Sequence, residues 1–527
     1  MCGQKFRFAQ HYLLQQLIHP SGNMHYLDIA VVVVYMGVIL ALGFVFGKHQ
    51  SRDEFFVASR SMGWLTVGLS VMATLFSSNS FVYYTAAALG DSLRLGAALV
   101  AFTLMTPFVM YIFIPVYAKL KVNSAYEYLE KRFHVSLRAL AAGLFVLLRI
   151  GWMASATYAA AVVVSSMTQF SETAVIITLG LVAISYTMLG GLRAVMWTDV
   201  IQFFVFAFTV FITIYLILSL TGLTAGKVMQ DYVTNHEVTY MDWKLSMTEK
   251  YGTWALLIGS FLEGLSAFGA DQVAVQRYLS AKSEQTSKIG AMLNLAGMWI
   301  VIPGLLFVGI CLHAHYTATP GELGQGTLEE MLANDAKLAD KGMSTFVRLH
   351  FPPGFAGLFM AALLAAIMSS IDSGVHSVAT VITVDFRDRL MPWLRPKTDA
   401  AELFFIRILV VVIGILSIVL ACFAGKLGNV FEVAKILTAA FGGPLLAMFL
   451  LGFFSRRTTS PGVFTGVLIA TLVTGALIAT QNWFAMWYWP IGFGTAMILG
   501  YVFSCATQAK PTRFTFSDIL HSTDSTS

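Results

Sequence analysis

The chain has 527 residues, of which 57% are hydrophobic and only 12% are charged, and its mean hydropathy is +0.74. This balance excludes an ordinary soluble domain and indicates a protein that lies in a lipid bilayer. The formal net charge of +5 comes without any dense basic stretch, so we expect no nucleic acid as a partner.

The predicted elements are hydrophobic helices, since a bilayer core takes about 20 consecutive apolar residues to cross. About thirteen such spans follow one another, at about 26–46, 63–89, 95–119, 136–167, 173–190, 195–221, 253–279, 286–314, 353–385, 401–424, 428–454, 459–480 and 484–506. The sequence therefore predicts an all-α polytopic membrane protein.

Cations gather in every second connection between these helices. They are Lys48, Arg52 and Arg60, then Lys119, Lys121, Lys131, Arg132 and Arg138, then Arg277, Lys282 and Lys288, then Arg387, Arg389, Arg395, Lys397 and Arg407, and last Arg456 and Arg457. The positive-inside rule places such connections in the cytoplasm. It predicts an N-terminus outside, a C-terminus inside, and external loops at 223–252 and 317–350.

The helices fall into two blocks of five that are flanked by additional segments. The predicted organisation is an N-terminal segment with an extra helix (1–62), a first block (63–222), an external loop (223–252), a second block (253–454), two further helices (455–506) and a cytoplasmic tail (507–527). Both blocks open with a helix that polar residues interrupt, TLFSSNS at 74–80 and EGLSAFGADQ at 263–272. Paired broken helices in halves of opposite orientation point to a transporter site at the membrane midplane.

A second polar cluster, AAIMSSIDSGVHS at 365–377, lies within an otherwise apolar span. Ala366, Ser369, Ser370 and Ser373 fall at i, i+3, i+4 and i+7, which is one face of a helix. Any single serine could simply bond a carbonyl of its own helix. The whole face, together with free carbonyls of a broken neighbour, offers the hard oxygen ligands that a dehydrated sodium ion prefers.

Five segments carry a family resemblance that covers nearly the whole chain. They are DEFFVASRSMGW (53–64), GGLRAVMWTDVIQ (190–202), ADQVAVQRYLSAKS (270–283), AAIMSSIDSGVHSVATVITVDF (365–386) and GGPLLAMFLLGFF (442–454). In these segments the chain resembles the sodium:solute symporters, relatives of the sodium/glucose, sodium/proline and sodium/iodide carriers. The resemblance implies a LeuT-type fold of two inverted five-helix repeats, alternating access and obligatory sodium coupling. We expect a plasma-membrane protein whose functional unit is a monomer.

The resemblance also implies where sodium binds. The family's sodium site falls on the carbonyls of Ala73, Phe76 and Ala366 and on the hydroxyls of Ser369 and Ser370. The second sodium site that some relatives have falls on Asp199, Ser369, Asp372 and Ser373. The alternative is a structural role for Asp372, neutral or bonded to backbone, which leaves one sodium per cycle.

The expected substrate region departs from that of the family's sugar carriers. Their helix 1 glutamine falls on Ser80, and their inner aromatic gate falls on Ala267, beside Phe268. Their sugar-binding glutamine on helix 10 falls on Lys435. These replacements argue against glucose or galactose as the solute.

Charged residues in the membrane interior then indicate another kind of solute. The expected membrane interior contains two cations, Arg149 and Lys435, and one acid, Glu263. Gly264, next to Glu263, belongs to the same candidate site. A desolvated cation demands an anion, so the excess of positive charge favours a carboxylate-bearing solute. A structural pair between Glu263 and Lys435 is the alternative.

Other classes of membrane protein lack their signatures in this sequence. A channel needs a filter motif, and a transporter-like sensor needs a signalling domain that the short polar tail does not supply. A membrane enzyme needs a metal cluster or a nucleophile, and His313 and His315 lie near an external loop without convergent acids. We therefore predict a sodium-coupled symporter and not an enzyme, with sodium/sugar symport as the alternative and a transporter-like membrane sensor or a channel as the alternative from another class.

Overall fold

The computed structural model describes residues 25–47, 51–74, 78–90, 92–168, 170–235, 241–335, 338–424, 430–507 and 514–521, and within them leaves out the side chains of 78–79, 235 and 430–435. In these ranges every regular element is a helix and no strand forms. The prediction of an all-α protein is confirmed for the described chain.

In the described chain nine helices are long and apolar enough to cross a membrane, or ten if one bent pair is a single span. Seven of the nine spans are one helix or part of one: α2 (Tyr26–Phe46), α9 (Val135–Met167), α10 (Glu172–Thr221), α14 (Glu284–Ala318), α19 (Asp399–Ala424), residues Ile436–Phe454 of α20 (Val430–Phe454) and α21 (Ser460–Thr480). The span Arg94–Leu120 contains α6 (Ala97–Phe108) and α7 (Ile114–Leu120). The span Phe355–Leu390 contains α17 (Phe355–Val381) and α18 (Asp388–Leu390). A tenth span consists of α12 (Thr253–Gly269) and α13 (Gln272–Ser280), which meet at 47°. The remaining apolar helices are α4 (Trp64–Ala73), α5 (Ser78–Leu89) and α22 (Tyr488–Cys505).

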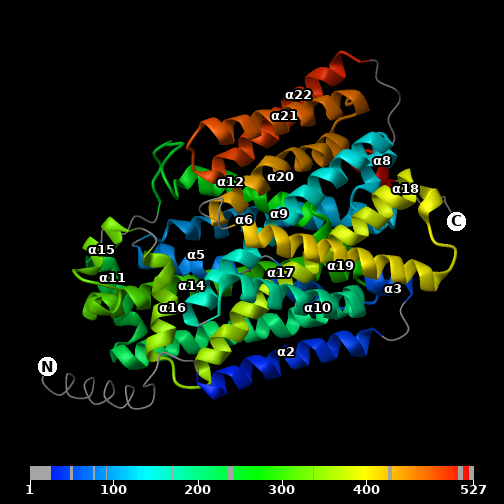
Figure 1. The fold of residues 1–527 in the computed structure, drawn as a ribbon. Coiled ribbons are helices and arrows are strands. Elements are labelled where there is room, and N and C mark those ends of the chain that lie inside the picture. The colour runs from blue at the N-terminus through cyan, green and yellow to red at the C-terminus, as the bar shows by residue number, and fades with distance from the viewer. Residues whose placement is uncertain are drawn as a thin grey trace, which may run out of the picture.

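The helices form an elongated bundle with α17 at its centre (Figure 1). The helix α2 runs along one edge, and α21 and α22 run along the opposite edge. Short helices cover the two ends of the bundle: α11 (Ala225–Asn235), α15 (Leu328–Asn334) and α16 (Leu338–His350) at one, and α3 (Arg52–Val57), α8 (Glu127–Arg132) and α18 at the other. The predicted loops at 223–252 and 317–350 thus contain helices.

Burial separates the central helix from those at the edges. All side chains from Phe359 to Val381 in α17 are buried, including its serines and Asp372. In α2, by contrast, Val33 and Val34 are more than 60% exposed. Apolar side chains directed outward are expected where the solvent is lipid, and polar side chains then belong in the interior.

Both predicted helix interruptions correspond to breaks. The helix α4 ends at Ala73 and α5 begins at Ser78. The second break is shorter than predicted, because α12 continues through Glu263 to Gly269 and α13 begins at Gln272. Asp271 ends the break, since its side chain accepts a 2.8 Å hydrogen bond from the backbone N–H of Val273 and caps α13.

The two helices predicted at 173–190 and 195–221 are the two parts of α10, which is kinked between them. They join at Gly191, whose φ of +57° lies in the left-handed region that glycine adopts without steric cost. The chain therefore changes direction there without a loop.

Candidate ion and solute sites

The serine face of α17 meets the end of α4, as the sodium prediction requires. The Ser369 hydroxyl lies 3.0 Å from the carbonyl oxygen of Ala73 and 3.1 Å from that of Ala366, and Ser370 lies 3.3 Å from the latter. Ala73 is the last residue of α4, and the carbonyls of a helix's last turn are free to accept other partners. Four of the five predicted sodium ligands therefore come together. The fifth, Phe76, lies outside the described residues.

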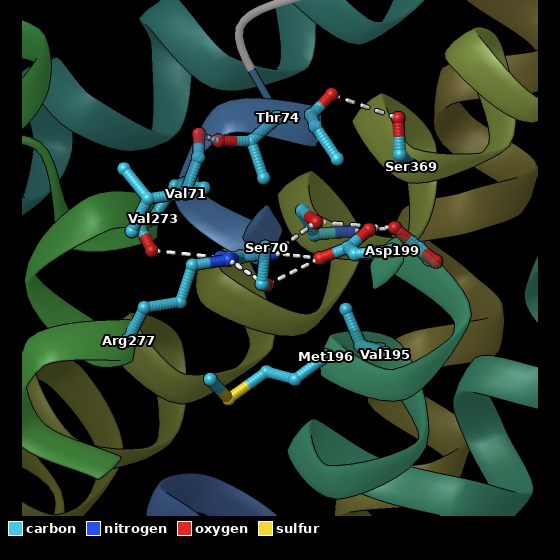
Figure 2. A network of polar contacts seen from close by, with 12 residues as sticks. Ser70, Val71, Thr74, Val195, Met196, Asp199, Val273, Arg277 and Ser369 are labelled. Atoms are coloured by element: carbon cyan, nitrogen blue, oxygen red, sulfur yellow. Dashed lines mark hydrogen bonds and ion pairs between the residues drawn. The ribbon is translucent and has the colours of Figure 1, made fainter. Parts of the chain in front are cut away.

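A buried network of polar side chains lies below these serines (Figure 2). Arg277 of α13 is fully buried, and its Nη2 lies 2.9 Å from Oδ2 of Asp199 in α10. Ser70 of α4 donates to the same oxygen at 2.5 Å and accepts from Arg277 Nε at 2.6 Å. Arg277 also donates to Ser373 of α17 and, at 2.8 Å, to the carbonyl of Val273. One guanidinium thus connects four helix segments.

Asp372 belongs to the same buried region through different partners. The hydroxyl of Tyr186 donates to its Oδ2 at 2.7 Å, and Ser373 donates to its Oδ1 through the backbone N–H at 2.5 Å and through the hydroxyl at 3.1 Å. Oδ1 of Asp199 is buried and has no hydrogen-bond partner among the described residues. Asp199, Asp372 and Ser373 therefore share one network, with two carboxylates for one guanidinium.

Arg277 was assigned to the wrong place by the positive-inside argument. It was counted as a cytoplasmic loop cation, whereas its side chain is fully buried and lies opposite Asp199. The partners are 78 residues apart, so no local spacing links them. The available signal was Asp199 itself, because an acid buried in a membrane span requires a cation or another strong partner.

The predicted substrate-binding residues gather around one cavity next to the two helix breaks. Those that line it are Ser80, Arg149, Glu263, Gly264, Ala267 and Phe268. The side chain of Lys435 lies outside the described residues. Aromatic side chains of α5, α9 and α22 form further walls: Tyr83, Tyr84, Trp152 and Trp489. The cavity also reaches Thr74, which follows the carbonyl that Ser369 contacts.

The charge balance of this cavity differs from the prediction. Arg149 forms an ion pair with Asp271, an acid that the sequence argument did not count. The pair joins α9 to the break before α13, across 122 residues. Nε of Arg149 is nevertheless buried without a hydrogen-bond partner in the described structure. Asp271 thus accepts from only some of the guanidinium N–H groups, and the Nε–H group remains a donor for another acceptor.

Known proteins resemble this chain over most of its length. A model of the sodium:solute symporter family matches residues 55–470. The sodium/sialic acid symporter NanT of Aliivibrio fischeri is 31% identical over 500 residues, which cover 91% of this chain and 93% of that protein. The sodium-coupled monocarboxylate transporter 1 of Mus musculus is 28% identical over 447 residues, 83% of this chain and 71% of that protein.

Solved structures share the fold. The substrate-bound, outward-open structure of a Na+-coupled sialic acid symporter superimposes with a TM-score of 0.84 at 25% identity. The match covers 93% of this chain and 99% of the symporter chain. The nucleobase-cation-symport-1 transporter Mhp1, at 14% identity, has a TM-score of 0.55 over 87% of this chain and 96% of its own, which supports the fold alone. The family's proteins are transporters, and sodium is their coupling ion. The predicted transport function and the predicted coupling ion are therefore confirmed. The chain is a multi-pass membrane protein that belongs to the sodium:solute symporter family.

Proposed function

We propose that this symporter imports a small carboxylate-bearing solute together with sodium. The observation that carries the proposal is the Arg149 guanidinium in the cavity wall, whose buried Nε has no hydrogen-bond partner among the residues that the structure describes. Asp271 forms an ion pair with Arg149 but accepts from only some of the N–H donors of the guanidinium. A carboxylate accepts two parallel N–H donors from a guanidinium, a pairing that a neutral sugar hydroxyl does not reproduce. The relatives named for sialic acid and for monocarboxylates carry solutes of this chemistry.

We place the coupling sodium on Ala73, Phe76, Ala366, Ser369 and Ser370. Support comes from the hydroxyl and carbonyl oxygens that converge between α4 and α17 at 3.0 to 3.3 Å. The site adjoins the solute cavity through Thr74, which lines that cavity. An ion bound there would fix the end of α4 against α17 and so organise one wall of the cavity.

We place a second sodium at Asp199, Ser369, Asp372 and Ser373. The supporting argument is charge: Asp199 and Asp372 are both fully buried, and Arg277 compensates only one of them. An uncompensated buried carboxylate costs several kcal/mol, so it takes up a proton or a cation. Oδ1 of Asp199, which is buried without a hydrogen-bond partner in the described part of the chain, offers a ligand.

We further propose thirteen transmembrane helices in two inverted repeats, with α10 providing two of them, and a monomer as the functional unit. The orientation is N-terminus outside, because Arg52 and Arg389 belong to α3 and α18, which lie at the same end of the bundle (Figure 1). Cys505 is exposed near the end of α22 and provides a test. In a Cys2→Ser background, an impermeant maleimide should label it in inside-out vesicles and not in right-side-out ones.

Solute flux into proteoliposomes tests the proposed activity. Labelled lactate, N-acetylneuraminate and glucose are offered under an inward sodium gradient, with potassium in place of sodium as the control. We expect sodium-dependent accumulation of a carboxylate and no competition by glucose. Accumulation of glucose or galactose in preference to every carboxylate would instead support sodium/sugar symport. Passive equilibration without accumulation would support a channel.

A further inference from the structure

A cluster of metal-binding side chains lies away from the solute cavity, near the end of the bundle that carries α11 and α15. His315 is in the last turn of α14, Glu322 closes a short 3-10 turn (Pro320–Glu322), and His350 ends α16. Oε2 of Glu322 lies 2.9 Å from Nε2 of His315 and 2.8 Å from Nε2 of His350. All three ligand atoms lie within 4.8 Å of one another.

The sequence argument that His315 lacks a convergent acid is therefore wrong. Glu322 turns back from seven residues further along the chain, and His350 comes from another helix, 28 residues beyond Glu322. His313, two residues before His315, contacts the ring of Tyr232 and is not part of the cluster. Helix spacing alone could not reveal the site, because its members come from three separate elements.

We propose that His315, Glu322 and His350 bind a divalent transition-metal ion of the zinc class. Two imidazole nitrogens and a carboxylate oxygen are zinc's common ligands, with a fourth position for water. At zinc–ligand distances of about 2.1 Å, tetrahedral ligand atoms lie about 3.4 Å apart. The Glu322 oxygen would therefore lie about half an ångström farther from each imidazole nitrogen than it does now. The two imidazole nitrogens, which lie within 4.8 Å of each other, would come to the same tetrahedral separation.

The surroundings hold these ligands in position. His315 and His350 are both buried, 1% and 7% exposed, and their rings meet edge to face at 4.8 Å. Phe346 packs against both rings, with centroids 4.9 Å away in each case. Thr319 places its hydroxyl 3.2 Å from Nε2 of His315, a second oxygen beside the cluster. Fixed imidazoles lose little freedom on binding, which favours metal affinity.

The three proposed ligands come from separate elements, α14, the turn Pro320–Glu322 and α16. A bound ion would link α14 to α16 directly before α17 begins, on the side of the membrane that we propose to be external.

Zinc binding to the full-length protein in detergent tests the proposal. After metal is stripped with a chelator, Zn2+ is titrated in competition with a chromophoric chelator. We expect one ion per chain with a dissociation constant of about 1 µM or tighter. Glu322→Gln keeps a neutral acceptor for the imidazoles and should weaken binding at least tenfold. His521→Gln, at an exposed histidine on the short helix Phe516–His521, is the matched control and should leave binding unchanged.

Two results would overturn the proposal. One is wild-type protein without saturable zinc binding, and the other is equal affinity in the wild type and Glu322→Gln. The cluster would then be a hydrogen-bonded contact between helices. X-ray absorption on the zinc-loaded wild type does not depend on a variant that folds. It should show two imidazoles at about 2.0–2.1 Å, and a shell of sulfur or of oxygen alone would contradict the assignment.

Discussion

Ser369 and Ser370 provide side-chain oxygens at the meeting point of α4 and α17. Replacing either with alanine removes a hard ligand that no neighbouring side chain restores, so we expect apparent sodium affinity to fall at least tenfold. That corresponds to about 1.5–3 kcal/mol, the value of one hydrogen bond or contact to a charged group. The measurement is the sodium dependence of solute uptake in each single variant.

Ser185 provides the matched control for these serines. It lies on α10, is exposed, and bonds the Leu181 carbonyl of its own helix at 2.7 Å. Ser185→Ala should leave sodium dependence unchanged. An unaltered sodium response in both Ser369→Ala and Ser370→Ala would falsify the placement of the ion.

Arg149 allows a substrate role to be separated from a structural one. Arg149→Gln leaves the Asp271 carboxylate buried without its cation, which would lower activity in either case. The double variant Arg149→Gln/Asp271→Asn removes both charges. If Arg149 holds the solute, carboxylate uptake should stay at least tenfold reduced in the double variant, about the value of one charge-assisted contact. Recovery of uptake there would show that Arg149 only compensates Asp271.

The residues that could be predicted are those whose signal is local. The serine face of α17 follows from i, i+3, i+4 and i+7 spacing on one helix, and in the structure Ser369 contacts the carbonyl of Ala73. Arg277 and Asp271 were missed, because their partners Asp199 and Arg149 are distant in the chain. Coulombic pairing has no sequence periodicity, so only the folded bundle reveals it.

At the scale of elements, apolar length predicted the helices well and their ends less well. Polar residues from 263 to 272 suggested a long interruption, yet most of them continue α12 with their side chains in the cavity wall or against neighbours. Only Ala270 and Asp271 lie between the helices. A polar residue in a membrane span can therefore indicate either an unwound backbone or a wet face, and hydropathy does not separate the two.

Asp28 joins the first membrane helix to the central one. Its Oδ1 accepts hydrogen bonds from the backbone N–H groups of Gly354 at 2.7 Å and Gly357 at 2.8 Å, at the start of α17. Asp28→Ala leaves these donors without a cap and should destabilise the protein by about 1–2 kcal/mol. Asp28→Asn keeps an acceptor and should lose less. Thermal unfolding in detergent measures the difference, with exposed Asp53→Ala as the control.

Equal melting temperatures for Asp28→Ala and the control would contradict this role. The contact matters because α17 carries Ser369, Asp372 and Ser373. The extra N-terminal helix then has a defined structural task, which is to hold the first turn of α17.

At the scale of the whole molecule, the proposed second sodium site would determine how much charge moves in each cycle. Asp199 and Asp372 lie in a network that links α4, α10, α13 and α17, with Arg277 as its single guanidinium. If a second sodium completes this network, two sodium ions accompany one monovalent anion and one net positive charge enters the cell. If Asp372 is instead neutral, one sodium accompanies the anion and no net charge moves.

The two cases differ in their response to voltage. One charge crossing the membrane changes the available free energy by about 2.3 kcal/mol per 100 mV. With two sodium ions, the static-head ratio of a monocarboxylate in proteoliposomes should rise about 50-fold for each 100 mV, inside negative, set with potassium and valinomycin. Asp372→Asn should remove this dependence. Ser377→Ala is the control, a buried change on α17 whose hydroxyl bonds Gln276 at 3.0 Å instead of the acids. A voltage-independent ratio in the wild type, unaltered by Asp372→Asn, would leave the Ser369 and Ser370 site as the one that couples.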